Sequence, residues 1–267
     1  KGCPLDCVWC QNPETKSAGP QISYDPADCL GCGRCTDTCD AAAIRITPDR
    51  RYPVDTESCL LCGACTEACP TGALRIVGRE YSADELCGKL LVDEVFYGNS
   101  GGGVTLSGGE PTLHMDFAAE LARKLKERGI NLCIETCGMY DGERFREELL
   151  PWVDLIYFDI KLFDSAEHEK YCGLPNEIIV ENLGFLLGEA REKVLPRIPL
   201  IPGITATTEN LSAIKTFLLE HGADRIGLIP YNPLWLSKTR DIGIEPAYTR
   251  AEWLSREEKG EIRTALR

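Results

Sequence analysis

The sequence predicts an α/β protein in which a small cysteine-rich segment interrupts a larger parallel sheet covered by helices. Residues 29–39 and 59–69 repeat one cysteine pattern at an offset of 30, which is typical of two copies of one small unit that share a core. From residue 82 onward, helical segments alternate with short apolar runs. Regular alternation of this kind indicates a parallel sheet with helices outside, either a barrel or a doubly wound sheet.

The elements of the larger part follow one another in a regular order. Ser82 can cap a helix that runs to about Tyr97, with Glu85 at the capping-box position. Strands are expected at 104–106, 131–135, 154–160, 194–200 and 225–230. Helices are expected at 114–128, 141–149, 164–171, 176–190 and 208–221. The C-terminal ends of these strands would therefore meet at one rim.

Each predicted strand ends in polar or glycine residues. The chemistry of β/α barrels takes place at the C-terminal ends of the strands and in the loops that follow. The strand ends are Ser107-Gly108-Gly109-Glu110-Pro111, Glu135-Thr136-Cys137-Gly138, Asp159-Ile160-Lys161, Arg197 before Pro199, and Pro230-Tyr231-Asn232. One such end alone is weak support, because Gly-Gly is usually a turn and a terminal charge is usually solvated. Five together predict a functional rim.

Eleven of the fifteen cysteines stand in three ordered runs. The first, a CxxxCxxC, holds Cys3, Cys7 and Cys10. Two C-x2-C-x2-C-x3-C runs follow, namely Cys29, Cys32, Cys35 and Cys39, then Cys59, Cys62, Cys65 and Cys69. This spacing holds 4Fe-4S clusters in two-cluster ferredoxins, where the fourth cysteine of each run serves the other cluster. We expect one auxiliary cluster on Cys29, Cys32, Cys35 and Cys69, and another on Cys59, Cys62, Cys65 and Cys39. The first run would leave one iron open to a ligand.

A disulfide scaffold and a zinc site both fit these cysteines less well than iron–sulfur clusters do. Disulfide-rich domains are usually short and lack a full core, whereas this chain has 267 residues, 43% of them apolar. Zinc sites favour paired CxxC motifs or CxxC with histidines. The remaining Cys87, Cys133, Cys137 and Cys172 are expected to be inert packing residues, which is the default for free cysteine.

The net charge and the hydropathy of the chain argue against a nucleic-acid partner and against a membrane span. The net charge of −13 argues against nucleic acid, whose phosphates require a basic face. No stretch of about 18 uninterrupted apolar residues is present that would span a membrane. Because exposed iron–sulfur clusters degrade in oxygen, we expect a reducing, anaerobic cytoplasm.

The combination of these motifs resembles the radical S-adenosylmethionine superfamily, which pairs CxxxCxxC with a Gly-Gly-Glu after the next strand. The ferredoxin runs behind the first motif, S-G-G-G-V-T-L-S-G-G-E-P at 100–111, D-I-K at 159–161 and R-x-P-L-I-P-G at 197–203 resemble the glycyl radical enzyme activating enzymes. The resemblance covers essentially the whole chain. It implies a partial (β/α)6 radical-SAM barrel with an inserted small ferredoxin-like α+β domain.

The resemblance also implies domain limits. Residues 1–18 would form the cluster loop at the start of the barrel, residues 19–78 a two-cluster ferredoxin insertion, and residues 79–267 the rest of the barrel. Relatives carry a first barrel strand before this point. We therefore expect a fragment cut at both ends, with its N-terminal strand missing.

The activity that the resemblance implies is radical chemistry on a protein. The open iron would bind S-adenosylmethionine, and one electron would cleave it to methionine and a 5′-deoxyadenosyl radical. This radical would take a Cα hydrogen from one glycine of a partner glycyl radical enzyme. The two auxiliary clusters would relay electrons from a flavodoxin or ferredoxin, and the protein would be a monomer.

The resemblance further implies the residues around S-adenosylmethionine. Backbone groups of Gly108 and Gly109 would approach its amino group, and Glu110 would add a negative charge there. Asp159 and Lys161 would lie around its methionine and ribose parts, and Arg197 would offer a fork for its carboxylate.

A second group of implied residues lies around the nucleoside and a possible cation. Tyr231 and Ile229 would line the adenine, Asn232 would bond the ribose, and Trp9 would either pack near the adenine or simply fill space. Glu135, Thr136 and Asp159 would hold a monovalent cation beside the cofactor.

Two alternative functions remain at this point. The first is another radical S-adenosylmethionine maturase with auxiliary clusters, although these usually place the extra clusters after the barrel. The second is a non-catalytic polyferredoxin-type electron carrier, which explains Cys29–Cys69 but leaves the CxxxCxxC, the Gly-Gly-Glu and the five strand ends unexplained.

Overall fold

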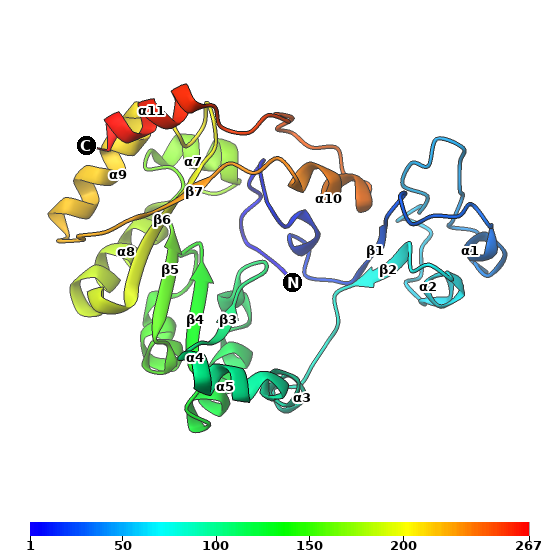
Figure 1. Cartoon of the computed structure of the whole chain (residues 1–267), viewed down its shortest axis with the longest axis horizontal. Helices are drawn as coiled ribbons and strands as arrows, with labels where there is room; N and C mark the ends of the chain where they lie inside the picture. Colours follow the sequence, from blue (N-terminus) through cyan, green and yellow to red (C-terminus); the bar gives the residue numbers. More distant parts are fainter. Residues whose placement is uncertain (267) are drawn as a thin grey trace. The chain divides into compact units, whose positions relative to one another are not determined.

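The computed structural model describes residues 1–266, which fall into two compact units (Figure 1). Unit 1 combines Lys1–Gly2, Val8–Glu80 and Pro233–Ala251, and unit 2 combines Cys3–Cys7, Tyr81–Asn232 and the segment from Glu252 on. Pro233–Ala251 belongs to unit 1 because α10 (Trp235–Asp241) packs on the short 3-10 turn Pro13–Thr15. There Lys238 Nζ donates to the carbonyl of Gln11 at 3.0 Å.

Unit 2 is built on one parallel sheet, in which five strands of the described chain follow the order β3-β4-β5-β6-β7. The strands are β3 (Gly103–Leu106), β4 (Asn131–Thr136), β5 (Leu155–Asp159), β6 (Val194–Leu200) and β7 (Gly227–Pro230). All five agree with the predicted strands to within two residues. The prediction of an α/β fold with a parallel sheet is confirmed.

The two faces of this sheet differ in chemistry. Successive side chains of a strand point to opposite faces, and Ile134, Ile156, Phe158 and Ile198 are all fully buried on one of them. The opposite face carries Glu135, Tyr157, Asp159 and Arg197. The register sets Glu135 beside Tyr157 and Asp159 beside Arg197, so that charged groups of three neighbouring strands share one face.

The helices of unit 2 come before, between and after the strands of its sheet. They are α3 (Ala83–Leu90), α4 (Glu94–Ser100), α5 (Met115–Glu127), α6 (Gly142–Arg144), α7 (Ser165–Cys172), α8 (Glu177–Glu189), α9 (Thr208–Glu220) and α11 (Arg256–Ala265). The predicted capping box is confirmed, because Ser82 Oγ accepts from Glu85 N and Ser82 N donates to the Glu85 carboxylate. The helix expected from Ser82 to Tyr97 is divided by a 3-10 turn at Leu91–Asp93.

Within the described residues, no helix has the length and apolar character needed to cross a membrane.

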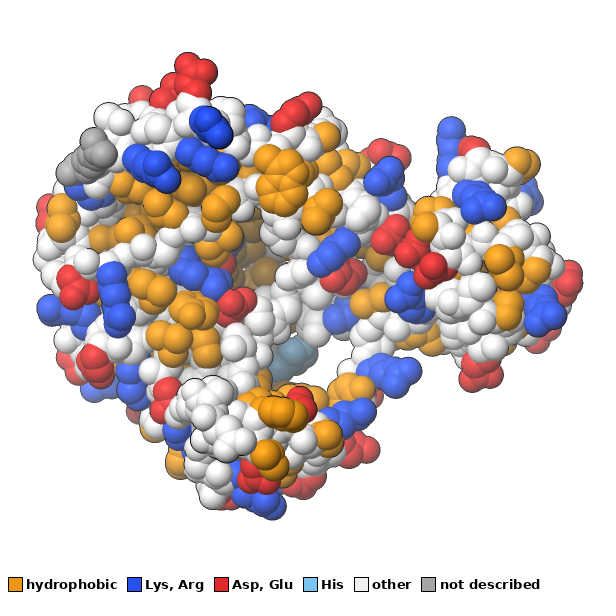
Figure 2. All heavy atoms as spheres, viewed as in Figure 1, with side chains coloured by type: hydrophobic (Ala, Val, Ile, Leu, Met, Phe, Trp, Pro, Cys, Tyr) orange, Lys and Arg blue, Asp and Glu red, His pale blue; other side chains and the backbone are white. Residues whose placement is uncertain are grey.

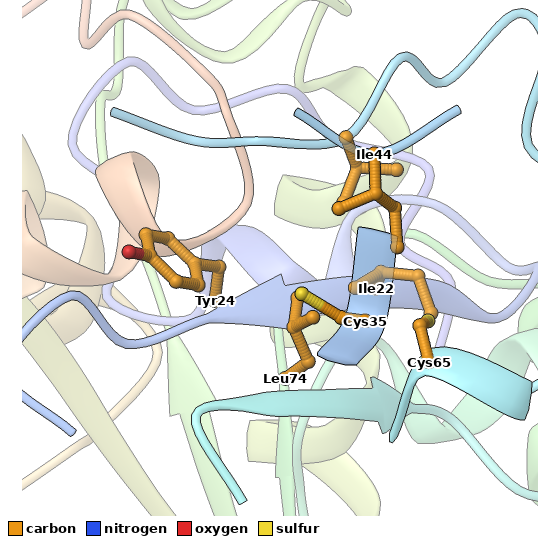
Figure 3. Close-up of a cluster of buried hydrophobic side chains, with 7 residues drawn as sticks. Ile22, Tyr24, Cys35, Ile44, Cys65 and Leu74 are labelled. Carbon is orange, nitrogen blue, oxygen red and sulfur yellow. The ribbon is translucent and has the colours of Figure 1, made fainter. Parts of the chain in front are cut away.

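Unit 1 is small and organised around its cysteine runs. An antiparallel pair joins β1 (Gln21–Tyr24) to β2 (Leu74–Val77), and the short helices α1 (Arg34–Asp37) and α2 (Ala64–Ala68) each follow a glycine with positive φ. Its buried core holds Cys35 of α1 and Cys65 of α2, one from each C-x2-C-x2-C-x3-C run, together with Ile22 of β1 and Leu74 of β2 (Figure 3). The internal repeat therefore shares one core, as predicted.

The surface carries no concentration of positive charge on the face shown in Figure 2. There, the described Lys and Arg side chains are interspersed with Asp and Glu side chains. This distribution agrees with the net charge of −13.

Candidate active site at the strand ends of unit 2

A row of charged side chains crosses β4, β5 and β6. The guanidinium of Arg197 bridges two carboxylates, with Nε 2.8 Å from Asp159 Oδ1 and Nη1 2.8 Å from Glu135 Oε1. Ser107 Oγ donates to the other oxygen of Glu135 at 2.6 Å. The Lys161 ammonium lies 3.9 Å from Asp159 Oδ2. The structure thus brings together four of the predicted site residues, namely Glu135, Asp159, Lys161 and Arg197.

The surroundings of Glu135 and Lys161 favour the charged form of each side chain. Burial raises the pKa of Glu135, but hydrogen bonds from Arg197 and Ser107 outweigh it and lower that pKa. Burial opposes the charge of Lys161, but the negative charge of Asp159 and nearby cysteines leaves its pKa raised. The Arg197 guanidinium also lies over the Tyr157 ring, 4.6 Å from its centroid. Two of its donor positions are committed to carboxylates of the protein itself, which sequence reasoning had missed.

Glu110 is a buried hydrogen-bond hub rather than an exposed charge. Its side chain is 3% exposed. Oε1 accepts from Thr112 N at 3.1 Å, from Thr112 Oγ1 at 2.7 Å and from Thr136 Oγ1 at 2.9 Å, while Oε2 accepts from Cys137 N at 2.7 Å. The carboxylate therefore ties the Gly-Gly-Glu loop after β3 to the end of β4.

Glu110→Gln should destabilise unit 2. A carboxylate is acceptor-only, whereas an amide turns one side into a donor, which would then face the backbone N–H of Cys137 or the threonine donors. We expect a loss of about 1.5–3 kcal/mol, the usual range for hydrogen bonds to a charged group. Chemical denaturation followed by circular dichroism measures it. The exposed Glu143→Gln serves as the control, and equal stability of the two variants would contradict the hub role.

The other predicted binding residues differ in their surroundings. Gly108 is exposed, has a φ of +118°, and has room for a Cβ, which would meet nothing within 4 Å. Gly109 follows it and is half-buried. Tyr231 is buried, Asn232 is half-buried and Ile229 is 37% exposed. Trp9 and Cys10 belong to unit 1, where Trp9 is buried.

Two cysteines of the CxxxCxxC meet cysteines that no sequence motif singles out. The neighbouring thiol of Cys137, at the end of β4, lowers the pKa of Cys3 to about 7. The neighbouring thiol of Cys172, at the end of α7, and burial raise the pKa of Cys7. The only signal for Cys137 was its place at a strand end, and none pointed to Cys172.

The cysteines of unit 1 lie close to one another in two groups. Cys29, Cys32, Cys35 and Cys69 line one cavity. In the second set, burial and the neighbouring Cys59, Cys39 and Cys62 raise the pKa of Cys65. Within residues 1–266, no three His, Cys, Asp or Glu side chains surround a point as the ligands of a single metal ion would. A cluster does not require this, because its cysteines bind different irons.

Two family models and several known proteins are similar to this chain. A family model described as the radical SAM superfamily matches residues 61–211, and one described as a 4Fe-4S dicluster domain matches residues 23–76. The chain is 41% identical over 235 residues to the trans-4-hydroxy-L-proline dehydratase activating enzyme of Clostridioides difficile, covering 87% of this chain and 77% of that protein. It is also 41% identical over 232 residues to the benzylsuccinate synthase activating enzyme of Thauera aromatica, and the match covers 85% of this chain and 70% of that protein.

The chain belongs to the radical SAM superfamily, among the glycyl radical enzyme activating enzymes. A radical SAM methyltransferase from Sphaerobacter thermophilus shares the fold with a TM-score of 0.54 at 18% identity, covering 71% of this chain and 56% of that one. The sheet of unit 2 is thus the partial barrel of this superfamily, as predicted. The activating enzyme is a radical S-adenosylmethionine enzyme that acts on a glycyl radical enzyme, and it uses S-adenosylmethionine with a 4Fe-4S cluster.

Proposed function

We propose that the activating enzyme holds three 4Fe-4S clusters. One would be bound by Cys3, Cys7 and Cys10, and two by the crossed sets of unit 1, the first on Cys29, Cys32, Cys35 and Cys69 and the second on Cys59, Cys62, Cys65 and Cys39. The cavity lined by four cysteines supports the first crossed set, and the mutual influence of the second four supports the other. All these donors are thiols, which iron–sulfur clusters require. The domain limits 1–18, 19–78 and 79–267 remain part of this proposal.

The observation that carries the proposal is the contact of the CxxxCxxC with the strand ends. Cys3 lies beside Cys137, which directly follows Thr136 at the end of β4, and the Thr136 hydroxyl donates to Glu110. Cys3 and Cys7 lie in the same unit as the Gly-Gly-Glu loop, which supports a shared site. When bound, the cluster supplies the electron that cleaves S-adenosylmethionine to methionine and a 5′-deoxyadenosyl radical.

The residues of the site bind and orient this cofactor. The backbone groups of Gly108 and Gly109 are proposed to approach the cofactor's amino group. Lys161 offers a permanent positive charge for its carboxylate, and Arg197 holds Asp159 and Glu135 at fixed positions beside it. Tyr231, Asn232 and Trp9 are proposed to contact the nucleoside. The monovalent cation at Glu135, Thr136 and Asp159 stays a prediction, and the Arg197 guanidinium already occupies one oxygen of each of the two carboxylates.

The partner is a glycyl radical enzyme, from which the activating enzyme takes one glycine Cα hydrogen. We propose that a flavodoxin or ferredoxin supplies electrons to the clusters of unit 1. We also propose that the activating enzyme works as a monomer.

The experiment that tests this function is anaerobic. The clusters are reconstituted and reduced, S-adenosylmethionine is added, and 5′-deoxyadenosine is measured by mass spectrometry together with the iron content. We expect about twelve irons per chain, since each cluster holds four, and formation of 5′-deoxyadenosine that depends on reduction. A protein with its clusters assembled that forms none would favour the electron carrier instead.

A further inference from the structure

The 30-residue repeat relates the two halves of unit 1 in structure as well as in sequence. Tyr24 pairs with Leu74 between β1 and β2, and the residues 30 positions away from each, Val54 and Ile44, form a bridge of the same antiparallel kind. The residues that follow Tyr24 and Val54 donate equivalent backbone hydrogen bonds, both 2.8 Å long. Equivalent positions beside the two cysteine sets can therefore be compared directly. The first set is Cys29, Cys32, Cys35 and Cys69, and the second set is Cys59, Cys62, Cys65 and Cys39.

A threonine hydroxyl contacts the first set. Thr71 Oγ1 lies 3.6 Å from Cys69 Sγ, within hydrogen-bonding range of a sulfur, and Thr71 lines the cavity that the first set forms. A cysteine that binds iron does so as a thiolate, which only accepts, so the hydroxyl is the donor of this bond in the loaded protein. In the second set, the equivalent position two residues after Cys39 is Ala41, whose side chain has no donor.

A second hydroxyl of the same cavity has no partner. Tyr24 lines this cavity, is 1% exposed, and lies in the buried core with Cys35 (Figure 3). Its hydroxyl is buried and makes no hydrogen bond within residues 1–266. A buried polar group without a partner is costly, and the sulfurs of a 4Fe-4S cluster would supply the missing acceptor. The equivalent residue beside the second set is the buried Val54, which has no polar side-chain atom.

Other donors do not cancel this difference. Tyr52 packs on the same core as Cys59 of the second set, but its hydroxyl donates to the carbonyl of Ile22 at 2.8 Å. Each set also accepts a backbone N–H, at 3.4 Å in the first set and at 3.3 Å in the second. The two sets are thus alike in their backbone donors and differ in the two side-chain hydroxyls.

We propose that the Thr71 and Tyr24 hydroxyls donate to the sulfurs of the first set and make its cluster the more easily reduced of the two in unit 1. Reduction adds negative charge to a cluster, and hydrogen bonds to its sulfurs stabilise that charge, which raises the reduction potential. The first electron that enters unit 1 therefore comes to rest on the first set. This inference rests on the proposed function, because it takes both crossed sets as cluster ligands.

The test is a redox titration of the reconstituted full chain, followed by electron paramagnetic resonance. The signal that changes when S-adenosylmethionine is added belongs to the barrel cluster, and the other two midpoints belong to unit 1. Tyr24→Phe and Thr71→Val each remove a hydroxyl while keeping the shape, and both should move the higher of these two midpoints to a more negative potential. Ala41→Thr adds a hydroxyl beside the second set and should raise the lower midpoint. Tyr52→Phe, the control, should leave both unchanged.

Each outcome decides the inference. Two coincident midpoints in the wild-type protein would overturn it, and so would a shift of the lower midpoint in Tyr24→Phe and Thr71→Val, or midpoints in these variants equal to those of Tyr52→Phe. All three results leave the proposed function intact.

A variant that does not assemble its clusters still leaves a decision. If Tyr24→Phe fails in this way, Thr71→Val and Ala41→Thr decide, because Thr71 is exposed and Ala41 is half-buried. Their expected shifts would support the inference, and unchanged midpoints would overturn it. A wild-type protein that shows no second and third cluster signal would overturn the proposed three clusters and this inference together.

Discussion

Cys3→Ala should abolish cleavage of S-adenosylmethionine while leaving the two auxiliary clusters assembled. Loss of an outer partner of a metal ligand already costs about 10–100-fold, so loss of a ligand itself should reduce 5′-deoxyadenosine formation by more than about 100-fold. Cys3 lies in unit 2 and the eight auxiliary cysteines lie in unit 1. The iron content should therefore fall by about one third, to about eight irons per chain.

The matched control is Cys133→Ala, which removes a thiol from β4 that is assigned to no cluster. Its iron content and product yield should equal those of the wild type. If Cys3→Ala kept its full iron content and still formed 5′-deoxyadenosine, the CxxxCxxC would not be the site of the chemistry. Loss of all iron would instead show that the clusters of the two units assemble together.

Gly138→Ala should be the most destabilising single change at the strand ends. Gly138 has a φ of +78°, and a Cβ there would lie 2.2 Å from Phe158 Cζ. Phe158 is a fully buried residue of β5, so it has no room to move away. Overpacking of a core costs about 1–3 kcal/mol, and a left-handed backbone about 1–2 kcal/mol for a residue with a Cβ. We expect a loss of about 2–5 kcal/mol in the free energy of unfolding.

This substitution should also disturb the site itself. The carbonyl of Gly138 accepts from the buried Asn182 side chain at 2.9 Å, and the neighbouring Cys137 is bonded to Glu110. Chemical denaturation provides the measurement. Gly188→Ala, in α8 with open space around its Cβ, is the control and should be neutral or stabilising because alanine favours helix. If Gly138→Ala were as stable as this control, Phe158 would have moved to make room for the added methyl group, and the expected clash would be contradicted.

The sequence predicted the fold well because the signals were local. Apolar runs and the Ser82 capping box depend only on neighbouring residues, and the C-x2-C-x2-C-x3-C spacing needs no knowledge of the fold. The internal repeat also predicted the shared core around Cys35 and Cys65. The β1–β2 pair was not anticipated, because its strands are only four residues long and lie about 50 residues apart.

The sequence identified residues of the candidate site but not the contacts between them. The strand ends identified Glu135, Asp159 and Arg197, but only the sheet register shows that Arg197 bridges the two carboxylates. Glu110 was expected to place a negative charge near the cofactor's amino group, and no sequence signal indicated that Thr112, Thr136 and Cys137 supply four donors to its buried carboxylate. Cys137 and Cys172 were expected to be inert. Their thiols neighbour those of Cys3 and Cys7, which lie more than 130 positions away in the sequence, and no local pattern encodes this proximity.

The most direct test of the activating function follows the abstracted hydrogen. Glycyl radical enzymes from several reaction classes are prepared with glycine deuterated at Cα and incubated anaerobically with the reduced activating enzyme and S-adenosylmethionine. With its partner, deuterium should appear in 5′-deoxyadenosine and a glycyl radical in the electron paramagnetic resonance spectrum. Cleavage of S-adenosylmethionine without deuterium transfer from any of these enzymes, although each is activated by its own activating enzyme, would contradict the activating function.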